Sequence, residues 1–534
     1  MVFFVFIATS MAAAKSQSTF RLIYDLFRAN CSSGGCHVSA SNPIFNAEGS
    51  ESDLYASLVN ALPVNPTARA KGYKLVDPGH PYNSFLLYKI GSDLDPYLTL
   101  GPEFGERTPQ AHSTLNDYDI ELVRQWILMG APQTGNKVNY PLLVEYYTQG
   151  GFDMLPIPAT PSPLEGMQVR VGPIFLAPGE EVEWDIKQHL RNQNTLKVYR
   201  TEGFMSWQSH HMLLFKYNGD GSGVREGLRR VPTEAFPFNG DVTLTGAWQN
   251  DDDFILPEGT AFFWRPNTVL DFDYHIKNYS NTEILPSDFY LNIYFDTSNT
   301  RNIEMHAKLV NNAALLLFRG DNSRVASENF HEDRYIYMMS SHLHKWGTDF
   351  DVYLKNADGS RGAQIYEGFF NEDYSFNQGY YDWEHPPIRY FNPMPKASYG
   401  LEYTARWNVG VPFVTFGLTA DDEMMLFTYL YTKEEVPQLP AASPERVESS
   451  QITLSPNPFT TGFHVDLHLD HAAKTTIELR DVPGKKIMTH ECGLLQPGNH
   501  QMWISSELMP FSGIYFVIIR INGEAVKTEK ITKI

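Results

Sequence analysis

Most of this chain consists of short apolar or alternating runs that are separated by Gly, Pro, Asn and Asp. Segments such as 254–266 and 463–470 show this pattern. Side chains of a strand alternate between its two faces, so runs of this kind predict β-strands. We therefore expect a mainly β protein.

The segment 18–133 departs from this pattern, because both of its ends have a helical period. Asn116 stands where the second helix would begin and is a plausible N-cap. The positions expected on one face of each helix are Phe20, Ile23, Leu26 and Phe27 in the first, and Ile120, Val123, Trp126 and Ile127 in the second.

Two proline-rich stretches, 156–166 and 433–451, read as linkers. They predict a domain order of 18–133, 165–297, 298–434 and 451–534. A chain of 534 residues is too long for one hydrophobic core, which agrees with several domains. The net charge of −20 argues against nucleic acid or an anionic membrane as a partner.

Residues 1–14 form one short apolar run that ends in small residues. A membrane span needs about 20 apolar residues, so a signal peptide is the better interpretation, although the run lacks a basic start. A buried first strand is the alternative. The chain has only three cysteines, Cys31, Cys36 and Cys492, so we expect no disulfide framework.

Cys31 and Cys36 are followed directly by His37, which resembles the haem c attachment motif with four intervening residues in place of two. Two thiols would bind the haem vinyl groups and His37 would be the proximal iron ligand. With its flanking helices, the segment 18–133 resembles the small cytochrome c modules of secreted bacterial proteins. The alternative is a disulfide between Cys31 and Cys36.

The sequence offers more than one distal iron ligand. Cytochrome c modules of this kind usually place Met-Pro before the last helix, whereas this chain has Thr108-Pro109. His112 or Met129 could replace the missing methionine, or the iron could be five-coordinate. Ligation by His112 would give a lower reduction potential than a methionine.

Three histidine clusters and one methionine point to transition metals. His342 and His344 alternate, so they would share one face of a strand and could chelate one ion. His210 and His211 are adjacent and would diverge, unless a bulge or strand end intervenes. His275 and Met424 complete the set. Imidazole suits several metals, but a thioether favours Cu(I).

In this order, the runs 210–214, 271–275, 341–347 and 422–424 resemble the copper type II, ascorbate-dependent monooxygenases, across residues 165–434. The resemblance implies two jelly-roll-like β-sandwiches and two copper ions. Its ligand sets would be His210, His211 and His275 for the electron-storing copper, and His342, His344 and Met424 for the copper that binds O2. The latter three would also form the catalytic centre.

The family resemblance implies hydroxylation of a substrate C–H bond with O2 and two electrons, which ascorbate or a redox protein would supply. The haem domain would be an electron entry point. Peptidylglycine hydroxylase grips its substrate carboxylate with Arg, Asn and Tyr, but the matching positions are Ser340, Leu426 and Thr428. We therefore expect a small organic substrate other than a glycine-extended peptide. The alternatives are a non-catalytic copper-binding protein and a haem electron-transfer surface protein.

The last segment, 451–534, contains Ser-Pro-Asn-Pro at 455–458 and Gly-Ile-Tyr at 513–515. It resembles the C-terminal sorting domain of type IX secretion in Bacteroidetes, with an immunoglobulin-like β-sandwich as the expected fold. The resemblance implies the secretion machinery as a partner, and a protein that is secreted or displayed on the outer membrane. An ordinary β-sandwich used for binding is the alternative.

Overall fold

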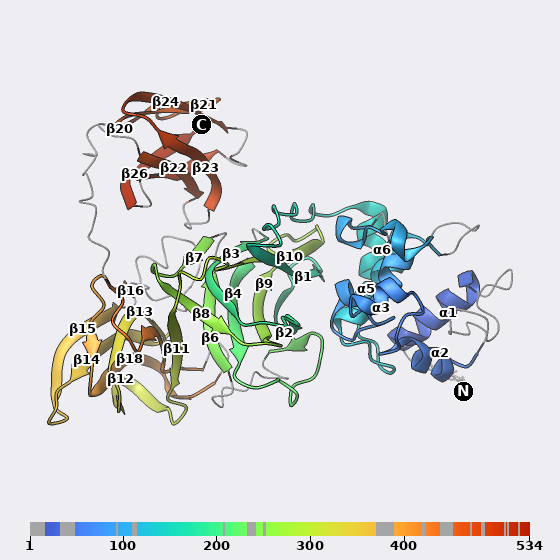
Figure 1. Cartoon of the computed structure of the whole chain (residues 1–534), viewed down its shortest axis with the longest axis horizontal. Coiled ribbons are helices and arrows are strands. Elements are labelled where there is room, and N and C mark those ends of the chain that lie inside the picture. The colour runs from blue at the N-terminus through green and yellow to red at the C-terminus, as the bar shows by residue number, and fades with distance from the viewer. Residues whose placement is uncertain are drawn as a thin grey trace, which may run out of the picture.

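The structure is a computed structural model, and it describes residues 17–31, 49–91, 94–108, 115–206, 209–231, 242–248, 252–369, 389–417, 422–437, 452–469, 473–481, 486–506, 509, 512–521 and 524–534. It is mainly β, as predicted, with a helical unit at the N-terminal end (Figure 1). The elements of the helical unit are α1 (Thr19–Cys31), α2 (Glu51–Leu58), α3 (Pro66–Ala70), η2 (Pro81–Asn83), α4 (Phe85–Ile90), η3 (Pro96–Leu98), η4 (Pro102–Phe104), α5 (Asp117–Leu128) and α6 (Tyr140–Gln149).

The amphipathic pattern of α1 produces the expected buried face, since Phe20, Ile23 and Phe27 are all inside the core. Helix α5 begins after Asn116, at the predicted place. The Asn116 side chain does not cap the helix, however, and instead donates to Asp119 Oδ2 at 3.1 Å. Helix α6 follows residue 133 and packs against α5.

The first β-sandwich has two facing sheets around one apolar core. One sheet consists of β1 (Gly166–Leu176), β10 (Leu285–Phe295), β3 (Leu196–Met205) and β8 (Thr260–Trp264), with β7 (Asp252–Ile255) paired to β3. The other consists of β5 (Arg229–Arg230), β2 (Glu181–His189), β9 (Val269–Lys277), β4 (Ser209–Tyr217) and β6 (Val242–Trp248). Strand β9 buries Phe272 and Tyr274 in this core and places Asp273 and His275 at alternate positions, as the period of two dictates.

The second β-sandwich repeats this plan around a separate core. One sheet consists of β11 (Ile303–Asn311), β19 (Leu426–Thr432) and β13 (Arg334–His342), with β16 (Arg389–Tyr390) and β17 (Lys396–Ala397) paired to β13. The other consists of β12 (Leu316–Asn329), β18 (Gly400–Thr415), β14 (Gly347–Lys355) and β15 (Arg361–Phe369). The two sandwiches share one continuous sheet, because β8 and β11 pair in parallel at Thr260–Ile303 and Ala261–Glu304.

The segment that leads into β11 is anchored to the first sandwich. Arg301 Nη1 donates to the carbonyl oxygens of Pro257 and Thr260, each at 2.9 Å. Lys197 Nζ reaches Asn302 Oδ1 at 2.6 Å. The connection between the sandwiches is therefore held by side chains as well as by the sheet.

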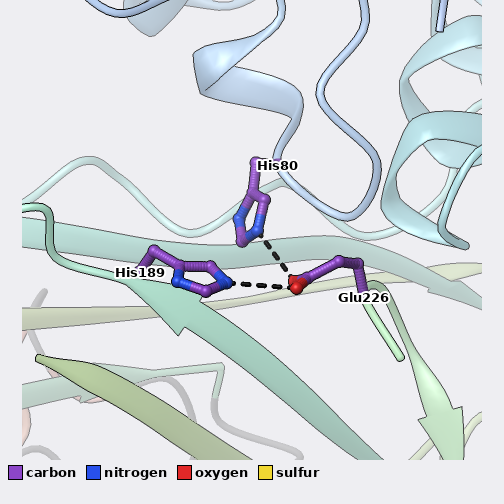
Figure 2. Close-up of side chains that lie close together, drawn as sticks. All are labelled: His80, His189 and Glu226. Atoms are coloured by element: carbon purple, nitrogen blue, oxygen red, sulfur yellow. Dashed lines mark hydrogen bonds and ion pairs between the residues drawn. The ribbon is translucent and has the colours of Figure 1, made fainter. Parts of the chain in front are cut away.

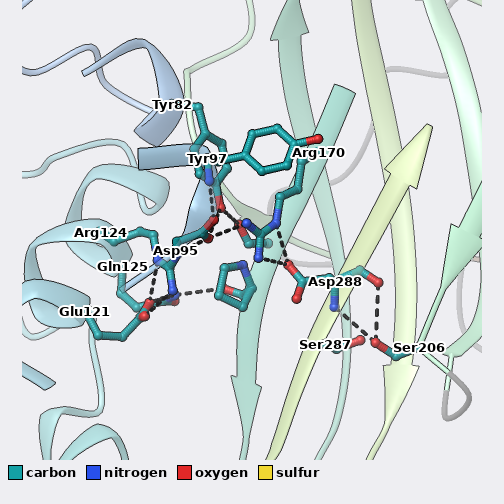
Figure 3. Close-up of polar contacts among 12 residues, drawn as sticks. Tyr82, Asp95, Tyr97, Glu121, Arg124, Gln125, Arg170, Ser206, Ser287 and Asp288 are labelled. Carbon is teal, nitrogen blue, oxygen red and sulfur yellow. Dashed lines mark hydrogen bonds and ion pairs between the residues drawn. The ribbon is translucent and has the colours of Figure 1, made fainter. Parts of the chain in front are cut away.

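The helical unit packs on the first sandwich, on the side away from the second (Figure 1). Figure 3 shows a buried network across this contact. Arg124 Nη1 lies 2.6 Å from Asp95 Oδ2 in the helical unit, and Arg170 of β1 contacts both Asp95 and Asp288, the latter at 2.8 Å. Burial raises the pKa of Asp95, but the two guanidinium groups lower it more, so its net pKa is below the usual range.

The tail forms its own sandwich and core. Strands β20 (Ile452–Ser455), β21 (Gly462–Leu469) and β24 (Gly498–Ser505) make one sheet, and β23 (Lys486–Leu495), β22 (Ala473–Asp481), β25 (Gly513–Ile521) and β26 (Glu524–Lys533) make the other. Within the described part of the chain, none of the helices has the length and apolar character that a membrane crossing needs.

Candidate metal centres

Two histidines of the first sandwich face each other across neighbouring strands. His211 of β4 and His275 of β9 are register partners in an antiparallel ladder. Their ring centroids are 5.2 Å apart with the planes at 77°. We call these residues the first histidine pair. Imidazoles at this spacing can reach one metal ion together.

A register irregularity lies between Ser209 and His211, at the position of His210. Adjacent residues on a regular strand point to opposite faces, so a bulge is what a shared metal site would need here. The backbone of His210 belongs to β4, whereas its side chain lies outside the described part of the structure. The bulge is compatible with the predicted role of His210.

Acidic side chains surround the first histidine pair. His275 Nε2 lies 3.0 Å from Glu181 Oε1, and His211 Nε2 lies 3.8 Å from Glu183 Oε1. The hydrogen bond with His275 is the main cause that lowers the pKa of Glu181 to about 2. Asp273 is close to Glu183 and His211, and burial raises its pKa well above the usual range. This concentration of carboxyl groups favours a cation at the pair.

The second sandwich holds a matching pair. His342 ends β13 and His344 lies two residues beyond it, with ring centroids 5.1 Å apart and planes at 83°. We call these residues the second histidine pair. His344 Nδ1 lies 3.2 Å from the carbonyl oxygen of Asp422. Donation from Nδ1 leaves the lone pair of Nε2 for a metal, the arrangement that metal-binding histidines usually have.

Glu423 connects this pair to Met424. Its Oε2 accepts hydrogen bonds from the backbone N–H of His344 and of Met424, each at 3.1 Å, and its Oε1 accepts from Trp346 N at 2.8 Å. Trp407 Nε1 donates to Oε2 at 3.0 Å. Glu423 is fully buried, and this burial raises its pKa. One carboxyl group thus holds His344 and Met424 next to each other.

Met424 is 5% exposed, and Met425 beside it is completely buried in the core of the second sandwich. The ladder continues from here into β19, where Leu426 is the partner of His342. The three residues predicted for the second copper therefore come from one short stretch where β13 and β19 meet. Two imidazoles and a thioether suit copper.

The positions that would hold a substrate carboxylate also lie on this ladder. Ser340 pairs with Thr428, and Leu426 is two residues away. Thr428 Oγ1 donates to the backbone carbonyl of Lys308 at 3.1 Å, so its hydroxyl is already used inside the protein. Neither Ser340 nor Leu426 can provide the paired N–H donors that a carboxylate prefers.

Only part of the predicted haem site can be located. Cys31 is the last residue of α1 and is buried. Cys36, His37 and His112 lie outside the described residues. Met129, the alternative distal ligand, follows α5 and packs against the cores of both the helical unit and the first sandwich.

A cluster of three polar residues and the structural role of a fourth were not predicted from the sequence. His80, His189 and Glu226 come together at the contact between the helical unit and the first sandwich. They lie 37 to 146 positions apart, and no spacing pattern connects them. Glu423 was noticed only as part of the Asp-Glu-Met run, and because it ends a run of three acidic residues at 421–423, nothing in the sequence indicated its buried role.

Comparisons with known proteins support the tail. Residues 453–533 match the family described as the secretion system C-terminal sorting domain. A search of curated proteins finds no match to the chain.

Solved structures give weak matches. They include a glycosyl hydrolase family 2 member from Bacteroides cellulosilyticus (12% identity, TM-score 0.17, 40% of this chain and 28% of that one). A second is β-glucuronidase 3 from Bacteroides uniformis (10% identity, TM-score 0.15, 40% of this chain and 27% of that one). A third is a Parabacteroides merdae β-glucuronidase (11% identity, TM-score 0.13, 62% of this chain and 36% of that one). The chain spans little more than a third of these proteins at most. What the comparisons establish is a type IX sorting domain, and hence a protein that is secreted or placed on the cell surface of a Bacteroidetes-type bacterium.

Proposed function

We propose that this chain is a dicopper monooxygenase that hydroxylates a C–H bond of a small organic substrate with O2. The observation that carries the proposal is the repeated histidine pair. Each of two joined β-sandwiches brings two imidazoles to about the same ring separation, 5.2 Å in the first and 5.1 Å in the second. The two pairs differ in their surroundings, which suits two different roles.

The surroundings of the pairs support different redox tasks. The first pair has Glu181 and Glu183 nearby, and their negative charge would help to retain the more positive, oxidised ion. In the second pair, Glu423 holds the backbone of Met424 next to that of His344, and a thioether is a soft ligand that favours Cu(I). Bound copper would supply the one-electron chemistry that O2 activation requires.

The residues around Met424 indicate the class of substrate. Leu426 offers an apolar side chain, and Thr428 uses its hydroxyl within the fold. We therefore infer a substrate without a carboxylate anchor at this place, and glycine-extended peptides are not expected to react.

Electrons could come from ascorbate or through the helical unit, for which we propose haem c bound by Cys31, Cys36 and His37. The buried network of Arg124, Asp95 and Arg170 supports the second route, because it holds the helical unit against the same sandwich that carries the first histidine pair.

The test begins with the copper content of the purified full chain and of His211→Ala and His342→Ala. His331→Ala, an exposed residue on the turn before β13, is the control. We expect the parent and the control to bind the same amount of copper, and each variant to bind one equivalent less. Copper binding that is unchanged in both variants contradicts the proposal.

Activity is then measured as incorporation of oxygen from 18O2 into a panel of small substrates, with ascorbate as reductant. Hydroxylated product that disappears in both variants supports the proposal. Two bound coppers without uptake of O2 under any of these conditions would favour a non-catalytic copper-binding protein.

A further inference from the structure

A second kind of metal site is suggested where the helical unit meets the first sandwich. Figure 2 shows the three side chains, which we call the junction triad. His80 precedes η2 in the helical unit, His189 ends β2, and Glu226 lies in the loop between β4 and β5. The triad is independent of the copper proposal.

The backbone brings these side chains together by close contact between glycines. A Cβ atom added to Gly79 would lie 2.4 Å from the backbone nitrogen of Gly227, and both residues have a positive φ, at +82° and +84°. Only glycine allows both features. His80 and Glu226 are the direct neighbours of these glycines, so their relative position is fixed by the backbone.

The donor atoms have the spacing that a small divalent cation needs. Glu226 Oε2 lies 3.1 Å from His80 Nε2, and Glu226 Oε1 lies 3.1 Å from His189 Nε2. Each of the three residues offers one ligand atom, and these three atoms lie within 4.8 Å of one another. In a tetrahedral zinc site with bonds of about 2.0–2.1 Å, ligand atoms lie about 3.3 Å apart.

The hydrogen bonds of His80 favour a metal-binding tautomer. Its Nδ1 lies 3.2 Å from Gln188 Oε1, while Nε2 faces the Glu226 carboxylate. A neutral imidazole has one N–H and can donate to only one of these oxygens. Donation from Nδ1 to Gln188 leaves the Nε2 lone pair directed at the negatively charged carboxylate. A cation between the two groups would remove the repulsion between them. A histidine oriented by a neighbouring acceptor in this way is typical of metal sites.

Lys187 orients the third ligand. Its Nζ lies 2.6 Å from Glu226 Oε1 and donates to the carbonyl oxygen of Gly221 at 3.0 Å. The carboxylate is therefore held through Oε1, and Oε2 remains available. The positive charge of Lys187 lowers the affinity of the site for a cation, so we expect reversible rather than very tight binding.

A cavity of about 410 Å³ opens beside the triad. Lys74 and Arg191 line it together with the three side chains, and both also contact Asp77. A ligand set of two imidazoles and one carboxylate leaves one position of a tetrahedral ion open. The cavity could give water or a small anion access to that position, with the two cationic side chains nearby.

We propose that the junction triad binds one Zn²⁺-class cation that links the helical unit to the first sandwich. The site is separate from the first histidine pair. His275 pairs with Glu183 on β2, and His189 lies at the far end of that strand, roughly 20 Å away at about 3.3 Å per residue. A single ion cannot serve both places.

The test measures Zn²⁺ bound to the full chain after treatment with a chelator, reloading and gel filtration. Zinc also binds to imidazoles at the copper sites, so the measurements use a His211→Ala/His342→Ala background. We expect one zinc equivalent beyond what remains at the weakened copper sites. That equivalent should be lost on adding Glu226→Gln or His189→Ala and kept on adding His331→Ala.

The same zinc content in all of these variants would overturn the proposal. Glu226→Gln keeps the size of the side chain and retains an acceptor, so it should fold, and circular dichroism checks this. A second measurement uses X-ray absorption at the zinc edge. Two imidazoles and one carboxylate in the background chain support the site, and a signal that does not change with Glu226→Gln refutes it. Neither result depends on whether the chain binds copper.

Discussion

The buried carboxyl group of Glu423 should be among the most sensitive positions of the second sandwich. It accepts hydrogen bonds from three backbone N–H groups and from the Trp407 indole, and water does not reach it. We compare Glu423→Gln with Glu423→Ala. The first keeps the shape of the side chain and one oxygen, whereas the second removes both acceptors.

The magnitudes follow from how the donors are divided. Glu423 Oε2 serves three donors, and Oε1 serves only Trp346 N. A glutamine can turn its carbonyl to the three donors, which leaves the Trp346 N–H facing an amide NH2. One buried donor without an acceptor costs about 1–3 kcal/mol. Alanine leaves four such donors, so we expect a loss of about 4 kcal/mol or more.

The assay is urea unfolding of the full chain, followed by tryptophan fluorescence, because Trp346 and Trp407 both contact the carboxyl group. Glu402→Ala is the matched control. Glu402 belongs to β18 of the same sandwich and forms a partly exposed ion pair with Arg361, whose loss should cost at most about 1 kcal/mol. The reasoning is refuted if Glu423→Ala unfolds no more easily than the control, or if glutamine is as damaging as alanine.

Three further changes test other parts of the molecule. Arg170→Met leaves Asp95 and Asp288 buried with one partner fewer, so the free energy of unfolding should fall by about 3–5 kcal/mol. Urea unfolding followed by the circular dichroism of the helices measures this, and an unchanged midpoint would contradict a structural role. Burial raises the pKa of Glu478, but hydrogen bonds from two arginines lower it by more, so its net pKa is below the usual range. The stability that Glu478 contributes is therefore present above its pKa in the unfolded chain and is lost as the pH falls through its pKa in the folded protein. Calorimetry of the tail between about pH 5 and pH 3 should therefore show a steep fall in Tm that Glu478→Gln makes shallower, and parallel curves would be the contrary result. Met424→Leu conserves volume and should cost less than about 1.5 kcal/mol, yet abolish hydroxylation if the proposed function is correct; full turnover would exclude the thioether as a ligand.

The sequence predicted the local parts of the architecture well, because those depend on neighbouring residues. The mainly β fold and the buried face of α1 follow from periodicity. Periodicity predicted one buried face for α5, whereas every residue of α5 from Asp119 to Leu128 is buried. The need for a bulge at His210 follows from the alternation of a strand, and the irregularity is present there. His342 and His344 lie close together, but β13 ends at His342, so the two residues do not share a strand face as the alternation argument assumed.

Contacts between distant segments were beyond this reasoning. His80 and Glu226 come into contact because two glycine-containing loops approach each other, and neither loop has a sequence pattern that predicts which segment it will contact. The same applies to Arg170 and Asp95, which lie in different domains. Charged residues at buried positions are detectable as exceptions in a sequence, but their partners depend on the tertiary fold.

The parallel pairing of β8 and β11 has a consequence for the movements that the protein can make. A hinge between the sandwiches would have to break this ladder and also pull Arg301 from the two carbonyl oxygens that it contacts. The gap between the two histidine pairs is then set when the chain folds and does not close around a guest molecule. In the proposed dicopper enzyme, electrons would therefore have to tunnel across a separation that is the same for every substrate.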